Sequence, residues 1–201
     1  MIVRESLDKI VEELFSDVKV NDFSINWILN SPRASENSVR EVYTFLRNRG
    51  LSDDKIASQA QLLGMNPETI ERNYQNHIGL LRENYQDRAS GRGLILNQPQ
   101  LLGISPETIN ANVQFLSYLG IDYNNYTNAL LLGTEPQTKR RKMAWMLREL
   151  FNYGNLPQEQ KREAINGLYR FVRDNPRVLI RSINSMGKSR KKLRERILQY
   201  K

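Results

Sequence analysis

The sequence predicts an all-α protein built as an array of stacked helix-pair repeats, an α-solenoid. The motif Leu-Leu-Gly-x-x-Pro-x-Thr occurs three times, with its glycines at positions 64, 103 and 133. Apolar residues recur at helical spacing after each copy, and no segment alternates apolar and polar residues as strands do. A period of this size is typical of repeat proteins, in which each repeat packs against its neighbours.

Each copy of the motif is expected to end one helix and begin the next. Glycine favours a helix end because it tolerates the left-handed conformation just past the last turn. Asn66 and Ser105 precede the motif prolines and are good N-caps, and proline in the first helical position loses no hydrogen bond. An imperfect fourth copy covers residues 28–32, and Asn175-Pro176 is interpreted as a fifth start.

Caps and helix breakers predict the helices in order. Their ranges are 4–16, 22–30, 36–49, 52–63, 67–85, 106–119, 122–132, 136–152, 158–174, 177–185 and 188–200. Residues 89–97 are predicted as a loop with a short helix, because two glycines interrupt them. A single elongated domain is expected over 1–201, with capping helices at 1–31, repeats at 32–176 and a basic cap at 177–201.

Composition excludes several function classes. The chain has no cysteine and one histidine, His77, so disulfides, cysteine nucleophiles and zinc sites built from Cys or several His are excluded. No run approaches the roughly 18 apolar residues of a membrane span. The acidic N-terminal segment resembles neither a transit nor a signal peptide, so a cytoplasmic, nucleoid-associated monomer is expected. No catalytic constellation surrounds His77, and we expect a non-enzymatic protein without cofactor, metal or small-molecule substrate.

Positive charge is concentrated in the last third of the chain. Residues 139–201 contain 18 basic and 5 acidic side chains, a net charge of +13, whereas residues 105–138 contain no basic side chain. The whole chain has a net charge of +8. In a repeat array, this distribution makes one end strongly electropositive, which favours binding of a polyanion.

Two basic clusters dominate this region. Lys139-Arg140-Arg141-Lys142 lies in the first turns of a predicted helix, where cations oppose the helix dipole, so local stability does not explain it. The second cluster extends from Lys188 to Arg196 on a predicted terminal helix, with Arg177 and Arg181 between the two clusters. The predicted nucleic-acid contacts are Lys139, Arg140, Arg141, Lys142, Arg177, Arg181, Lys188, Arg190, Lys191, Lys192 and Arg194.

Other interpretations of the clusters stay open. Basic runs are often only solvated surface, and a terminal repeat needs a polar outer face. The run at 139–142 also fits a nuclear-import signal. Lys139 stands three residues after its motif proline, where the earlier repeats have Ile70 and Ile109. A charged residue therefore occupies a position that holds a residue of the buried type in the other repeats.

The segment Pro99 to Ile121 resembles a repeat of the mitochondrial transcription termination factor family. The shared features are "proline, x, leucine-leucine", a serine-capped helix, and an ending in "phenylalanine-leucine, x-x, leucine-glycine". The resemblance implies a left-handed superhelix of helix pairs with short 3₁₀ turns. It also implies a basic path for double-stranded DNA or structured RNA and a role in transcription regulation.

Two functions follow from these observations. The first is a nucleic-acid-binding repeat protein that contacts duplex DNA or structured RNA through backbone phosphates. The second is a protein-interaction scaffold whose electropositive end meets an acidic partner.

Overall fold

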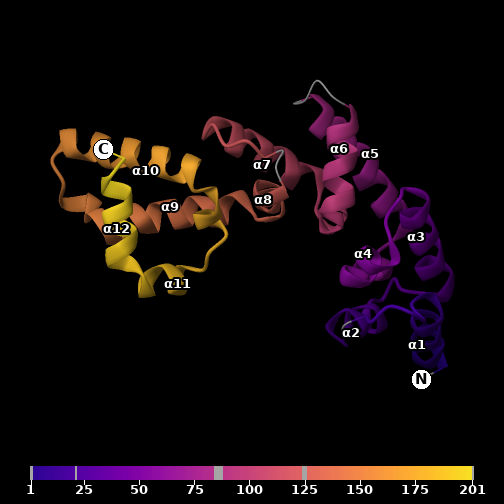
Figure 1. Ribbon diagram of the computed structural model, residues 1–201. Helices are drawn as coiled ribbons and strands as arrows, with labels where there is room; N and C mark the ends of the chain where they lie inside the picture. Colours follow the sequence, from indigo (N-terminus) through magenta and orange to yellow (C-terminus); the bar gives the residue numbers. More distant parts are fainter. Residues whose placement is uncertain (1, 21, 84–87, 124–125, 201) are drawn as a thin grey trace. The chain divides into compact units, whose positions relative to one another are not determined.

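α-Helices and short 3₁₀ helices are the only regular elements in residues 2–20, 22–83, 88–123 and 126–200, the parts that this computed structural model describes (Figure 1). This confirms the all-α prediction. The chain divides into two compact units, Met1–Pro106 and Glu107–Lys201. The single repeat domain over 1–201 stays a prediction.

In the N-terminal unit, short 3₁₀ turns alternate with longer helices. Its elements are α1 (Ile2–Leu14), α2 (Asp22–Asn30), α3 (Glu36–Asn48), α4 (Asp53–Ser58), η1 (Ala60–Gly64), α5 (Pro67–Glu83), α6 (Arg88–Asn97) and η2 (Pro99–Gly103). Turn η1 packs against α2 and α3, and α5 packs against α6 (Figure 1). Apolar side chains such as Ile28, Leu46 and Leu63, all fully buried, form the core.

The C-terminal unit follows the same alternation. Its elements are α7 (Pro106–Tyr118), α8 (Tyr126–Ala129), η3 (Leu130–Gly133), α9 (Pro136–Phe151), η4 (Tyr153–Asn155), α10 (Gln158–Asp174), η5 (Pro176–Leu179), α11 (Ile183–Lys188) and α12 (Arg190–Leu198). Helices α9 and α10 pack side by side, and α12 packs against both of them (Figure 1). Buried Leu193 and Ile197 attach α12 to this core.

The Leu-Leu-Gly motif forms 3₁₀ turns rather than α-helix ends. Each glycine closes one of the turns η1, η2 and η3, and none of the three has a positive φ angle. The expected left-handed conformation is therefore wrong for them. At Gly64 the reason for glycine is packing, because a Cβ atom would lie 2.7 Å from Cζ3 of Trp27. Asn66 caps α5 as expected, since its Oδ1 accepts from the backbone N–H of Thr69 at 3.3 Å.

Four predicted ranges differ from the structure. Among its described residues, the range 122–132 contains only the short helix α8 and most of turn η3, and residues 122–123 are not helical. The range 177–185 is divided between turn η5 and helix α11, because Pro176 begins a 3₁₀ turn and the side chain of Ser182 caps a new helix. Residues 52–63 are split into α4 and η1, because the chain changes to 3₁₀ geometry before the leucines. Residues 88–97 form the continuous helix α6 instead of a loop. Gly91 is buried there, and a Cβ atom at this position would lie 3.3 Å from Cβ of Leu81, so glycine permits close packing on α5. The predicted end of α5 at residue 85 and positions 124–125 of the predicted range 122–132 lie outside the described residues.

One hydrogen bond recurs where a long helix meets the next 3₁₀ turn. Asn73 donates from Nδ2 to the carbonyl of Leu102 at 2.8 Å, and Asn112 donates to the carbonyl of Leu132 at 2.6 Å. Both asparagines are buried, and each stands six residues after its motif proline. Both acceptors belong to the second leucine of the following Leu-Leu-Gly motif. We call this arrangement the repeat joint. Buried His77 adds a second hydrogen bond to the Asn73 joint, because its Nε2 donates to the carbonyl of Leu101 at 2.9 Å. His77 therefore has a structural role.

Candidate nucleic-acid interface

The two units differ sharply in charge. Residues 107–201 contain 18 basic and 8 acidic side chains, a net charge of +10, whereas residues 1–106 contain 12 and 14, a net charge of −2. Any surface that attracts a polyanion through net charge therefore belongs to the C-terminal unit. The eleven predicted contact residues all lie in this unit, but the structure gives them different environments.

Lys139 and Lys142 lie in the interior, which corrects their interpretation as surface contacts. Lys139 is fully buried, and its ammonium group donates to the carbonyl of Thr134 and to Oδ1 of Asn112. Lys142 is 7% exposed, and its Nζ donates to the carbonyl of Leu179 at 2.7 Å. Neither ammonium group is placed to reach a phosphate in this conformation.

The position of Lys142 in the repeat explains its burial. Like Asn73 and Asn112, it stands six residues after the motif proline, and it donates to the second apolar residue of the following turn, Leu179 of η5. Lys142 thus forms the repeat joint between α9 and η5. Lys139 reinforces the joint before it, because it bonds to the Asn112 side chain that holds η3.

Burial changes the acid–base behaviour of both lysines. Burial, together with the nearby positive charge of Lys142, lowers the pKa of Lys139 to about 7. Burial also lowers the pKa of Lys142. A charged amine is disfavoured away from water, so the hydrogen bonds to carbonyl oxygens are needed to hold these side chains inside.

Arg140 and Arg141 are exposed, in contrast to their two neighbours. The guanidinium carbon of Arg140 lies 5.9 Å from the ring centroid of Phe115, a cation–π contact on the surface of α7 and α9. Arg140 also lines an open groove of about 770 Å³ together with Tyr118 and Tyr169. Two of the four residues of the first cluster therefore remain candidates for binding.

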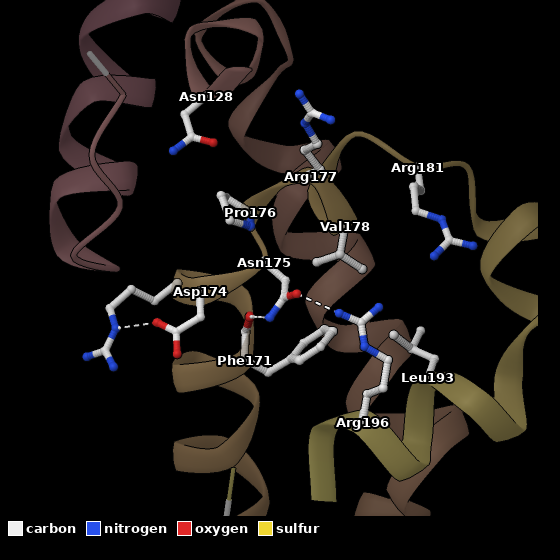
Figure 2. A pocket seen from close by; sticks show the side chains of 11 residues that line it. Asn128, Phe171, Asp174, Asn175, Pro176, Arg177, Val178, Arg181, Leu193 and Arg196 are labelled. Atoms are coloured by element: carbon white, nitrogen blue, oxygen red, sulfur yellow. Dashed lines mark hydrogen bonds and ion pairs between the residues drawn. The ribbon is translucent and has the colours of Figure 1, made fainter. Parts of the chain in front are cut away.

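An arginine-rich cavity of about 510 Å³ lies where α10, η5 and α12 meet (Figure 2). Its lining residues are Asn128, Phe171, Arg173, Asp174, Asn175, Pro176, Arg177, Val178, Arg181, Leu193 and Arg196. We call it the arginine cavity. In Figure 2, Arg181 and Arg196 approach the cavity from opposite sides, whereas Arg177 is directed away from them. A smaller cavity shares Arg181 and Arg196 and adds Lys192, so the basic surface continues along α12.

Two arginines of the cavity are held in place. Arg196 donates from Nη2 to Oδ1 of Asn175 at 2.6 Å, and its guanidinium carbon lies 5.4 Å from the ring centroid of Phe171. Arg181 donates from Nη2 to Oγ of Ser189 at 3.1 Å. These contacts leave other N–H groups on each guanidinium, which has five donors.

Of the remaining predicted contact residues, four are exposed cations and one, Arg190, forms an ion pair within the fold. Lys188, Lys191, Lys192 and Arg194 are exposed on α11 and α12. Arg190 instead forms an ion pair with Glu149 at 3.0 Å and donates to the carbonyl of the same residue, so it attaches α12 to α9.

Sequence reasoning missed Arg173 and left Arg196 out of the predicted contacts. Arg173 pairs with Asp174 at 3.1 Å, and both line the arginine cavity. No motif or cluster singles out Arg173, because it stands alone near the end of α10. Arg196 belongs to the second basic cluster. It stands three residues after Leu193, and this helical spacing indicates that both side chains lie on the same side of the helix.

Comparison with known proteins gives no family. No protein-family model matches the chain, and the search of curated proteins found no match. Within the described residues, no helix is long and apolar enough to span a membrane.

Proposed function

We propose that this chain is a non-enzymatic nucleic-acid-binding protein that holds phosphate groups through the exposed cations of its C-terminal unit. The observation that carries the proposal is the set of four arginines that line one cavity in a unit with a net charge of +10. Arginine suits this role because its planar guanidinium matches phosphate geometry with two parallel hydrogen bonds.

The repeat motifs and their resemblance to mitochondrial transcription termination factors support the same proposal. We propose that the repeats stack into a solenoid and that the exposed cations follow its C-terminal end. The phosphate contacts then fall to Arg140, Arg141, Arg177, Arg181, Lys188, Lys191, Lys192 and Arg194, with Arg173 and Arg196 added by the cavity. Lys139, Lys142 and Arg190 support the fold instead.

Fluorescence anisotropy with labelled duplex DNA, duplex RNA and single strands, titrated across salt, tests this function. Binding should weaken steeply with salt, with a slope of roughly 0.9 per neutralised phosphate on duplex DNA. The variant Arg177→Gln/Arg181→Gln/Lys192→Gln should bind more weakly and with a smaller slope.

A matched variant in the N-terminal unit, Lys9→Gln/Lys19→Gln/Arg33→Gln, removes the same charge from exposed positions. It should bind as the wild type does. Absence of binding to every ligand at low salt would reject the function and favour an acidic protein as the partner. Equal losses in both triple variants would show that only overall charge matters.

A further inference from the structure

The arginine cavity has more positive charge than an internal nucleic-acid phosphate requires. Four arginines and one aspartate line it; Arg173 is paired with Asp174 and Arg177 is directed away, so Arg181 and Arg196 supply two positive charges to the cavity (Figure 2). The arginines come from four separate segments: Arg173 from α10, Arg177 from η5, Arg181 from the turn after it, and Arg196 from α12. An internal phosphodiester carries one negative charge. A terminal phosphate monoester carries about −1.5 to −2 near pH 7 and offers three acceptor oxygens.

The cavity is also large enough for more than a phosphate group. Its volume of about 510 Å³ lies within the range of about 300–1,000 Å³ that small-ligand pockets occupy. Pro176, Val178 and Leu193 give it apolar walls beside the guanidinium groups. Val178 and Leu193 are only 5% and 3% exposed, so they are fixed parts of the unit. Such walls suit the carbon atoms of a sugar or a base attached to the phosphate.

Two of the cations are already positioned for a ligand. Asn175 and the ring of Phe171 hold Arg196, and Ser189 holds Arg181. A side chain that is fixed before binding loses less conformational entropy when the ligand arrives. The same contacts leave N–H donors on both guanidinium groups to meet the additional oxygen of a monoester.

We propose that the arginine cavity binds the terminal phosphomonoester of a nucleic-acid strand. This inference rests on the proposed function and makes it more specific: the exposed lysines and arginines outside the cavity hold internal phosphates, and the cavity recognises a phosphorylated end. A free nucleoside monophosphate presents the same group, so it should also enter the cavity, with lower affinity because it lacks the neighbouring phosphates.

The test uses the full chain and one single-stranded oligonucleotide of about 12 nucleotides, within the usual site size of about 4–16. The strand is prepared with a 5′-phosphate, with a 3′-phosphate, and with hydroxyl groups at both ends, and each carries its fluorophore in the middle. At least one phosphorylated strand should bind about tenfold or more tightly than the hydroxyl strand, as charge-assisted hydrogen bonds to the added group predict.

Arg181→Gln and Arg196→Gln should each abolish this preference. Arg194→Gln is the matched control, because Arg194 is exposed on the same helix and lines neither cavity. It should weaken all three strands alike and keep the ratio. Thermal melting of each variant checks the fold. If the loss of the Arg196 contact with Phe171 destabilises Arg196→Gln, the variant Arg181→Gln still tests the site.

The outcomes separate the two proposals. Equal affinity for all three strands would overturn the terminal-phosphate site and leave the proposed function standing. Failure of all three strands to bind would overturn the terminal-phosphate site, and only the additional failure of duplex DNA and duplex RNA would reject the proposed function. Calorimetry with adenosine monophosphate distinguishes the sources of the group: binding that is lost in Arg181→Gln supports the cavity as the site, and a free nucleotide that binds as tightly as the strand would overturn the assignment to strand ends.

Discussion

The two units use the same repeat joint but differ in what surrounds it. In the N-terminal unit, an amide and an imidazole side chain, those of Asn73 and His77, hold η2, and the net charge is −2. In the C-terminal unit, Lys142 occupies the position of Asn73, Lys139 occupies that of Ile70, and the net charge is +10. The difference teaches that the basic residues of the C-terminal unit are of two kinds. Some are buried supports of the fold, and the others form the exposed surface that can meet an anion.

The largest expected effect is the loss of stability in Lys139→Ala. Removing a fully buried long side chain leaves a cavity, and it leaves the carbonyl of Thr134 without this donor. Truncations of this size cost about 2–5 kcal/mol. Urea unfolding followed by circular dichroism measures the effect. Arg141→Ala, an exposed neighbour, should change stability by at most about 0.5 kcal/mol. Equal stability of the two variants would contradict the burial of Lys139.

The next effect is on the pH dependence of stability. The pKa of Lys139 is about 7 in the folded chain, below its ordinary value of 10.5. Between these values the unfolded chain binds the extra proton, so the free energy of unfolding should rise as the pH increases from 7 to 10.5. The slope from this group is at most about 1.4 kcal/mol per pH unit. Below pH 7 both states are protonated and this slope disappears.

Comparison with Lys139→Met isolates this contribution. Denaturant unfolding of both proteins at several pH values gives the difference in unfolding free energy. The free energy of unfolding of the wild type should increase relative to that of Lys139→Met as the pH rises from 7 to 10.5. A difference that stays constant over this range would show that the Lys139 amine keeps an ordinary pKa.

A smaller effect should distinguish the two asparagine joints. Asn112→Leu removes the donor to Leu132 and the acceptor for Lys139, and should lower the free energy of unfolding by about 1–3 kcal/mol. Asn73→Leu also loses its bond to Leu102, but Oδ1 of Asn73 is buried without a hydrogen-bond partner among the described residues. Removing that oxygen offsets part of the cost, so Asn73→Leu should be the milder change. Equal costs in parallel urea titrations would contradict this account of the joints.

Most of the long helices and their order could be predicted from the sequence. The proline starts, the cap at Asn66 and the helical spacing of apolar residues are local signals, and they act within one or two turns. The 3₁₀ geometry of the Leu-Leu-Gly turns was missed, because it depends on packing such as that of Trp27 over Gly64. Helix α6 was missed for the same reason: Gly91 lowers helix propensity, but its contact with α5 compensates.

The candidate site was predictable only in part. Charge concentration led to the unit that contains the arginine cavity, and Arg177 and Arg181 line that cavity. The burial of Lys139 and Lys142 was not expected, because lysine is almost never fully buried without a partner. The repeat did contain the signal. Lys142 occupies the position of Asn73 and Asn112, which carry polar side chains on an otherwise apolar face, and a polar residue there indicates a buried hydrogen bond.

The most direct test of the central claim is amine labelling of the folded chain with and without duplex DNA, read by mass spectrometry. Lys139 and Lys142 should resist labelling in both samples because they are buried. The exposed lysines at 188, 191 and 192 should react freely and become protected by the DNA, whereas Lys9 and Lys19 should react equally in both samples. Rapid labelling of Lys139, or equal protection of the lysines in the two units, would contradict the division into buried supports and an exposed binding surface.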